Sequence, residues 1–153
     1  MPTTSPATTS DPVDPLVEAV NQIGDRWSLL VVDALLTGAR RFGELLDDID
    51  GLAPNILSSR LKQLEHDRLV TAEPYSERPV RYSYRLTAAG EELAGVLRLL
   101  TQWSASRHAA SRAAPTAGGL AHPVCGTPLE AQWFCPTCGD IVEAEAADDL
   151  CWV

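Results

Sequence analysis

The residue types best suited to chemistry gather near the C-terminus, where two short segments repeat one pattern. His122-Pro-Val-Cys125-Gly and Cys135-Pro-Thr-Cys138-Gly each order a metal ligand, a proline, a spacer, a cysteine and a glycine. Two ligands three residues apart on a tight turn can face one ion, and the glycine lets backbone amides turn toward the sulfur. The pair predicts a zinc ribbon with a structural zinc ion, whose ligands are His122, Cys125, Cys135 and Cys138.

Other states of these cysteines have to be weighed. A structural disulfide is rare in a cytoplasmic protein, and free thiols leave the repeated turn unexplained. Cys151 is an alternative fourth ligand, which would replace His122 and give an all-cysteine site. A catalytic zinc ion needs an open coordination position, and two complete knuckles leave none.

The elements that carry this cluster begin after an N-terminal segment, MPTTSPATTSDP, which is rich in Thr, Ser and Pro and predicts disorder over residues 1–12. The chain lacks the pattern of a signal peptide and the ~18 consecutive apolar residues of a membrane span. We therefore expect a soluble, cytoplasmic protein that does not enter a membrane.

Three helices are expected before residue 50. Asp14 and Asp25 are suited to cap the first two, and the third covers residues 41–49. Apolar residues recur at helical spacing, and we expect the following to face inward: Leu16, Val20 and Ile23; Trp27, Leu30, Val31, Ala34 and Leu35; Phe42, Leu45, Leu46 and Ile49.

A fourth helix is expected from Pro54 to about Asp67, followed directly by a β-hairpin. Its stripe of Leu57, Leu61 and Leu64 predicts the buried face. The opposite face carries small or hydrogen-bonding side chains: Asn55, Ser58, Ser59, Lys62, Gln63 and His66. This face suits base and phosphate contacts, although a merely solvated face is the alternative.

The hairpin alternates an apolar with a basic face and has its tip at residues 76–79. Val80, Tyr82, Tyr84 and Leu86 are expected to face inward, and Arg81, Ser83 and Arg85 outward. Pro74 and Pro79 cannot donate to a strand ladder, so the ribbon belongs at a sheet edge. A helix that can enter a groove followed by such a ribbon predicts an α+β winged helix-turn-helix.

A long helix is expected from Thr87 to about His108, with a stripe of Leu93, Val96, Leu97, Leu100 and Trp103 widened by Leu99. A rod of ~30 Å is longer than so small a domain can cover, which predicts pairing with a second copy; packing within the monomer is the alternative. The chain thus divides into residues 1–12, a winged-helix and dimerisation domain over 13–110, a linker over 111–120 and a zinc-ribbon-like acidic tail over 121–153.

The net charge of −9 is distributed unevenly. Residues 1–24 hold three acids and residues 113–153 six, with no Lys or Arg in either segment, so residues 25–112 carry twelve acids and twelve bases. The acidity therefore does not exclude nucleic acid as a partner of the central domain. We expect base-edge contacts from Asn55, Ser58, Ser59 and Lys62, and contacts to phosphates or the minor groove from Arg40, Arg41, Arg60, Arg78, Arg81 and Arg85.

Two of these arginines have structural alternatives. Arg60 could instead pair with Glu44 or Glu65, and Arg41 could cap a helix.

Several spaced motifs resemble the HxlR family of bacterial transcriptional regulators, relatives of the MarR-type winged helices. They span roughly residues 14–105: Ile23-Gly24 with Arg26-Trp27, Arg41-Phe42 with Glu44-Leu45, Leu57 with Arg60-Leu61 and Leu64-Glu65, and Tyr84 with Leu86-Thr87 and Gly90. The resemblance implies a homodimer joined through terminal helices. Each subunit would place one recognition helix in successive major grooves of a pseudo-palindromic double-stranded operator.

Two positions depart from the family pattern. Many members have a cysteine immediately before the first helix, used to sense electrophiles or oxidants; here Asp14 stands there, so that switch is absent. The turn after the recognition helix usually has glycine where this chain has Arg68, which predicts a left-handed backbone held at some cost.

We expect a DNA-binding transcriptional regulator, acting as a repressor, and not an enzyme. No nucleophile, base and orienting group converge in one motif. A protein-interaction adaptor that kept the winged helix, and a regulator that senses metal or oxidant through the Cys/His tail, are the competing functions. The sequence identifies no small-molecule effector.

Overall fold

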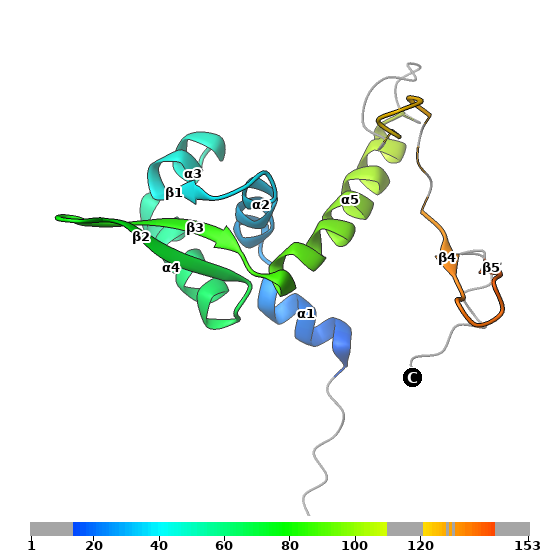
Figure 1. The fold of residues 1–153 in the computed structure, drawn as a ribbon, viewed down its shortest axis with the longest axis horizontal. Coiled ribbons are helices and arrows are strands. Elements are labelled where there is room, and N and C mark those ends of the chain that lie inside the picture. Colours follow the sequence, from blue (N-terminus) through cyan, green and yellow to red (C-terminus); the bar gives the residue numbers. More distant parts are fainter. Residues whose placement is uncertain (1–13, 110–120, 128, 130, 143–153) are drawn as a thin grey trace, which may run out of the picture. The chain divides into compact units, whose positions relative to one another are not determined.

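The computed structural model describes residues 14–109, 121–127, 129 and 131–142, in two compact units that divide between Ala94 and Gly95. The first unit contains helices α1 (Pro15–Ile23), α2 (Arg26–Leu35), α3 (Phe42–Asp48) and α4 (Pro54–His66). It also contains strands β1 (Arg40–Arg41), β2 (Val70–Glu77) and β3 (Val80–Leu86) and the first turns of α5 (Ala88–Ala109) (Figure 1). The second unit holds the rest of α5 and strands β4 (Trp133–Phe134) and β5 (Ile141–Val142).

The expected capping residues begin the first two helices. The Asp14 carboxylate accepts a hydrogen bond from the amide of Leu16 at 2.8 Å. The Asp25 carboxylate accepts from the amides of Trp27 and Ser28 at 3.0 and 3.2 Å. These bonds satisfy amides that have no partner within the helix, so the predicted starts of α1 and α2 are confirmed.

A core of aliphatic side chains joins α2, α3 and α4 to the base of the hairpin. Leu57, Leu61 and Leu64 of α4 are buried, as their spacing predicted. The remaining buried apolar residues are Val31, Val32, Leu35, Leu45, Ile49, Leu52, Leu69, Val70 and Leu86. Ser28 is the one buried polar residue in this core, and its hydroxyl donates to the Asp25 carboxylate.

Some expected inward positions are wrong. Leu16 and Val20 of α1 are 69% and 55% exposed, and Leu30 of α2 is 43% exposed. Helical periodicity identifies an apolar face, but it does not provide the neighbouring element that covers it. No residue of α1 is fully buried.

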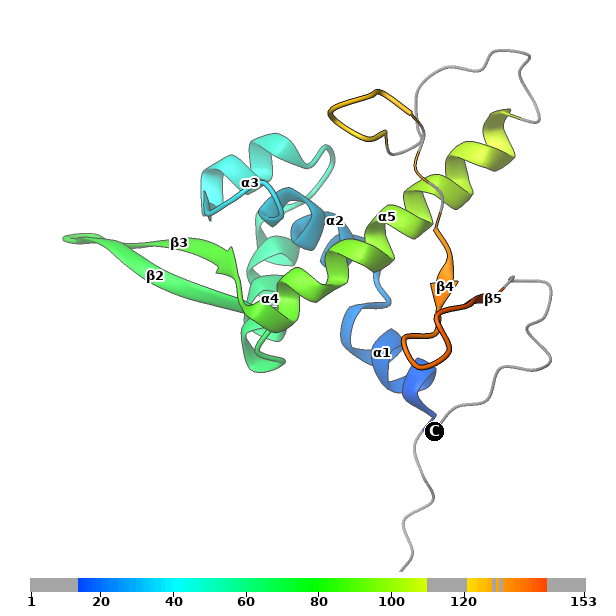
Figure 2. The same ribbon diagram turned by 45° about the vertical axis from the view of Figure 1, so that its right-hand side comes forward.

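The three-stranded sheet has the antiparallel order β1–β3–β2. Pro74 lies in the edge strand β2, as expected, and the β2–β3 register shifts between Pro74 and Ser76. β1 pairs only Arg40 with Tyr84 and Arg41 with Ser83, so the outer part of the hairpin has two strands. Figures 1 and 2 both show this ribbon extending past α3 and α4.

The junction between the hairpin and α5 is close-packed. The Thr87 amide donates to the Leu69 carbonyl at 3.0 Å, and the Gly90 amide donates to the Thr87 hydroxyl at 3.2 Å. A β-carbon on Gly90 would lie 2.2 Å from the Leu69 carbonyl oxygen. Glycine is therefore required at position 90 for the first turn of α5 to approach the backbone at Leu69, just before β2.

Arg68, between α4 and β2, has φ of 59° and is the only non-glycine residue with positive φ in the described part of the chain. The left-handed conformation expected from the sequence is thus confirmed.

Helix α5 begins after Thr87 and ends at Ala109, close to its expected bounds. Four residues of its stripe are exposed: Val96, Leu99, Leu100 and Trp103. None of the helices that the structure describes is both long and apolar enough to cross a bilayer.

Candidate nucleic-acid interface

Helix α4 has one buried and one exposed face. Because the three leucines anchor the first, Asn55, Ser59, Lys62, Gln63 and His66 are exposed and Ser58 is half-buried. The Gln63 amide nitrogen donates to the Asp67 carboxylate at 2.9 Å, so its side chain is engaged at the end of the helix. The exposed face of α4 therefore carries hydroxyl, amide and ammonium groups. Groups of these types contact base edges and phosphates.

Arg60, near the middle of α4, is fixed within the unit. Its Nε lies 3.4 Å from Oδ1 of Asp25, the residue that caps α2. The alternative ion pairs expected for Arg60, with Glu44 or Glu65, are not formed, so that prediction is wrong. Residues 25 and 60 are far apart in sequence, and no local spacing links them, whereas Glu65 lies on the same helix and Glu44 on a neighbouring one.

Asp25 receives interactions of opposite effect on its pKa. Burial acts to raise the pKa, but the hydrogen bonds from Ser28, the charge of Arg60 and the amide of Trp27 outweigh it. The pKa therefore lies below its ordinary value, and the charged carboxylate is the form that holds both α2 and Arg60.

The wing, defined as residues 70–86 of the β2–β3 hairpin, carries three of the predicted arginines. Arg85 forms an exposed ion pair with Glu73, with its Nε 2.9 Å from the carboxylate. Arg78 and Arg81 are exposed, and no carboxylate among the described residues pairs with them. These two cations are available to an outside anion.

The two faces of the wing differ less than the alternation predicted. Leu86 is buried and Tyr84 half-buried, but Tyr82 and Val80 are 44% and 57% exposed. The inward prediction therefore holds only at the base, because the ribbon extends beyond the helices that could cover its tip (Figure 2). Burial first, and then the charges of Glu65 and Tyr82, raise the pKa of Tyr84, so its hydroxyl stays protonated at neutral pH.

Arg41 is exposed beside the wing. Its guanidinium carbon lies 4.5 Å from the ring centroid of Tyr75, a cation–π contact that orients the side chain and leaves its charge intact. The backbone amide of Arg41 donates to the Glu44 carboxylate at 2.6 Å at the start of α3. The predicted capping role is thus filled by the Arg41 backbone, and the guanidinium remains outside it.

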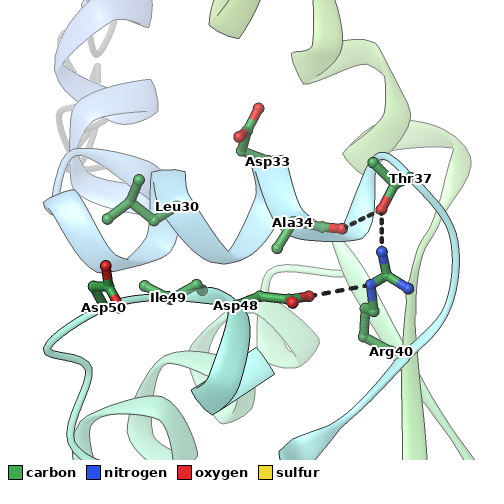
Figure 3. Close-up of a pocket in the computed structure, with 8 residues that line it drawn as sticks. All are labelled: Leu30, Asp33, Ala34, Thr37, Arg40, Asp48, Ile49 and Asp50. Atoms are coloured by element: carbon green, nitrogen blue, oxygen red, sulfur yellow. Dashed lines mark hydrogen bonds and ion pairs between the residues drawn. The ribbon is translucent and has the colours of Figure 1, made fainter. Parts of the chain in front are cut away.

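The guanidinium group of Arg40 is paired within the first unit. Its Nε lies 3.4 Å from Asp48, and its Nη2 donates to the Thr37 hydroxyl at 2.8 Å (Figure 3). Arg40, Asp48 and Thr37 line a cleft of about 520 Å³. The other lining residues are Leu30, Asp33, Ala34, Ile49 and Asp50. Since Asp33, Asp48 and Asp50 all lie there, the cleft repels phosphate.

Three features of this region cannot be predicted from the sequence alone: strand β1, the Arg41–Tyr75 contact and the Asp25–Arg60 ion pair. A two-residue strand has no detectable periodicity. For the ion pair, the only local signal was Asp25 as a helix-capping residue, which did not indicate the distant cation.

The predicted metal ligands lie in two separate pairs. His122 Nδ1 is 3.3 Å from Cys125 Sγ, and Cys135 and Cys138 lie in the second loop. Within the described parts of the tail and the rest of the described chain, no three His, Cys, Asp or Glu side chains gather into one group. Cys151 lies outside the described residues, so the choice of fourth ligand remains a prediction.

Hydrogen bonds lower the pKa of two of these thiols. The side chain and then the backbone of Thr127 hold the pKa of Cys125 below its ordinary value. The amide and then the thiol of Cys138, followed by the Thr137 amide, do the same for Cys135. Amides turned toward the sulfur were expected from the glycine of each repeat.

Comparison with known proteins connects this geometry to one family. A model of HxlR-like helix-turn-helix proteins matches residues 22–112. An HTH-type transcriptional regulator of Mycobacterium tuberculosis is 35% identical over 126 residues, which cover 82% of this chain and 78% of the relative.

Two solved structures are similar in fold. A MarR-family transcriptional regulator from Enterococcus faecalis V583 is 34% identical with a TM-score of 0.57, covering 70% of this chain and 97% of that one. A transcription factor from Pseudomonas aeruginosa is 33% identical with a TM-score of 0.64, covering 92% of this chain and 90% of that one. The latter match extends past α5 into the C-terminal part.

Proposed function

This chain belongs to the HxlR-like helix-turn-helix family, and from that premise we propose that it is a homodimeric repressor that binds a pseudo-palindromic DNA operator. Its relatives are HTH-type transcriptional regulators with a MarR-like winged helix. The operator contacts, the dimer and the direction of regulation are the parts of the proposal that experiment has to test.

The observation that carries the proposal is the exposed polar face of α4 beside unpaired wing arginines. Asn55, Ser59 and Lys62 are exposed on a helix whose opposite side is fully buried. A helix in this setting can enter a major groove, while the adjacent ribbon reaches the flanking backbone. We assign base-edge contacts to Asn55, Ser58, Ser59 and Lys62.

The six arginines divide by their partners in the structure. Arg41, Arg78 and Arg81 keep an uncompensated charge among the described residues and are assigned to phosphates or the minor groove. Arg85 can exchange Glu73 for a phosphate, since an exposed ion pair contributes little. Arg40 and Arg60 are assigned to positioning, because each is paired inside the first unit.

The exposed stripe of α5 supports a dimer. Val96, Leu99, Leu100 and Trp103 are each 44% or more exposed along one helix. A second copy would bury these groups against its own equivalent stripe, as in an isologous two-fold interface. Two recognition helices related by this symmetry fit half-sites ~34 Å apart along the DNA.

Repression needs only two surfaces, the DNA-binding face of α4 with the wing and the exposed stripe of α5. A dimer that occupies successive major grooves excludes polymerase from the same DNA. Activation would require a further contact with the transcription machinery.

The test is binding of the full chain to the DNA upstream of its own coding sequence, measured by fluorescence anisotropy over a range of salt. We expect a specific complex of two chains per site, whose affinity falls steeply with salt. A promoter–reporter fusion should show lower expression when the protein is present. Affinity no greater than for unrelated DNA of equal length would contradict the proposal, and an adaptor function would then be favoured.

A further inference from the structure

Two loops of the second unit have the same backbone geometry. In the first, residues 122–127, the His122 amide donates to the Thr127 carbonyl and the Gly126 amide to the His122 carbonyl, both at 2.8 Å. In the second, residues 135–140, the Cys135 amide donates to the Asp140 carbonyl and the Gly139 amide to the Cys135 carbonyl, both at 2.9 Å. We call these loops knuckle 1 and knuckle 2.

The second-to-last residue of each knuckle is a glycine that the loop requires. Gly126 and Gly139 have φ of 71° and 78°, in the region where a side chain is strained. In both loops this left-handed residue directly follows the cysteine. The sequence repeat is therefore also a repeat of structure, down to the same pair of backbone hydrogen bonds.

The first knuckle holds its two ligand atoms at a spacing suited to zinc. With Zn–S of ~2.3 Å and Zn–N of ~2.0 Å, a tetrahedral ion separates its sulfur and nitrogen ligands by ~3.5 Å. The observed distance from His122 Nδ1 to Cys125 Sγ is 3.3 Å. The second knuckle repeats the backbone hydrogen bonds of the first, so Cys135 and Cys138 occupy the same two positions of the loop as His122 and Cys125.

The described residues of the tail form no hydrophobic core that could stabilise its fold. Val124, Trp133, Phe134 and Ile141 are all 56% or more exposed, and β4 and β5 pair over only two residues each. None of the three described cysteines is in a disulfide. A segment this small without a core depends on a cross-link or an ion for its stability.

We propose that the two knuckles together bind one structural Zn²⁺ ion through His122, Cys125, Cys135 and Cys138. The ion draws the two preformed pairs into one tetrahedral site and supplies the folding free energy of the tail. Three thiolates and an imidazole in tetrahedral geometry select zinc over the oxygen-seeking cations. This site is independent of the proposed function, because it makes no use of α4 or the wing.

The experiment measures metal in the full chain purified under reducing conditions without added metal. We expect about one zinc ion per chain, as for a closed four-ligand site. Replacement by Co²⁺ should give the sulfur-to-cobalt charge-transfer band and the intense visible bands of a tetrahedral thiolate site. His122→Ala and Cys135→Ser should each weaken zinc affinity by more than about tenfold.

Cys151→Ser is the matched control, since it removes a cysteine outside both knuckles. It should leave zinc content and the cobalt spectrum unchanged. The helical circular dichroism signal comes from α1–α5. If the site stabilises the tail alone, this signal should be lost at the same midpoint temperature in all variants. Loss of metal in every variant together with loss of the helical signal would show misfolding of the whole chain and overturn the proposal of an independent tail site.

Two results would overturn the site itself. A chain that carries no zinc and takes up no Co²⁺, with every thiol free to react, has no such site. A chain that loses the metal with Cys151→Ser but keeps it with His122→Ala uses four cysteines instead of the set proposed.

Discussion

The Nε atom of Arg60 lies 3.4 Å from Oδ1 of Asp25, so the centre of α4 is joined to the residue that caps α2. Arg60 belongs to the helix proposed to read DNA, yet its charge is compensated inside the protein. The buried leucines set which face of α4 is exposed, and the ion pair adds one polar contact between α4 and the start of α2. Its contribution to stability is small, because both side chains are about one third exposed.

The pair predicts a stability change that depends on pH. Because the folded pKa of Asp25 is below its ordinary value of 3.8, its contribution is complete above that value and is lost as pH falls through the folded pKa. Asp25→Asn keeps a capping side chain but loses the charge, and should lower the free energy of unfolding at pH 7 by no more than ~1 kcal/mol. Urea unfolding at pH 7 and in the acid range measures both effects.

Asp33→Asn is the control for this prediction, because it removes an exposed carboxylate from α2, the helix that Asp25 caps. Its free energy of unfolding should stay within ~0.5 kcal/mol of the wild type at pH 7. Equal acid sensitivity in Asp25→Asn and the wild type would show that Asp25 is not the group responsible.

Arg81→Ala tests the wing. Removing one unpaired cation should weaken DNA binding about tenfold and reduce the slope of log affinity against log salt by ~1. The matched control is Arg98→Ala, which removes the same charge from α5, outside the proposed interface. Similar losses in both variants would indicate a general charge effect and contradict a contact by the wing.

Much of this surface could be predicted from sequence, and the reason is local. Leu57, Leu61 and Leu64 lie three and four residues apart, so helical geometry alone places them on one face. The hairpin follows in the same way from alternation along β3. Arg60 and Asp25 come from different helices, and their contact depends on how those helices pack, which no local pattern contains.

Exposure was the other quantity that the pattern could not provide. Tyr82 and Leu86 occupy equivalent positions in the alternation of β3, yet one is exposed and the other buried. The difference arises because only the base of the ribbon lies against the helices (Figure 1). A period of two specifies the face of a strand, and the length of the covering element determines how far that face is buried.

Gly90→Ala should destabilise the fold. Its β-carbon would lie 2.2 Å from the Leu69 carbonyl oxygen, a backbone atom that cannot move aside without displacing β2 or α5. We expect a loss of ~1–3 kcal/mol in the free energy of unfolding. Gly95→Ala on the same helix meets nothing within 4 Å and should instead stabilise by up to ~1 kcal/mol. Equal effects of the two substitutions would contradict the close approach.

Arg68→Gly should leave stability unchanged or raise it by up to ~1 kcal/mol. Removing the strain of a left-handed non-glycine residue should raise the free energy of unfolding by ~1–2 kcal/mol. The greater freedom of glycine in the unfolded chain offsets part of this gain. Arg68→Ala removes the same side chain and keeps the strain, so it should not stabilise. Thermal unfolding of the three proteins separates the backbone effect from that of the side chain.

Leu100→Glu tests the dimer. A charge within the exposed stripe of α5 should shift the chain to a monomer in analytical ultracentrifugation and weaken operator binding at least about tenfold, since two half-sites then bind independently. Gln102→Glu adds the same charge two residues along the helix, outside the stripe, and should remain dimeric. A wild-type chain that is monomeric at micromolar concentration would rule out this arrangement.

The pairing of some interface arginines with carboxylates has a kinetic consequence for a protein that searches a genome. Affinity for arbitrary sequence grows with each phosphate neutralised, and here Arg40 and Arg60 are already paired with carboxylates inside the first unit. Residence on unrelated DNA should therefore be brief, with frequent release and re-encounter in place of long sliding. Such a protein would spend less time trapped on competing sequence, and its occupancy of a target would depend more on what α4 recognises than on the field around it.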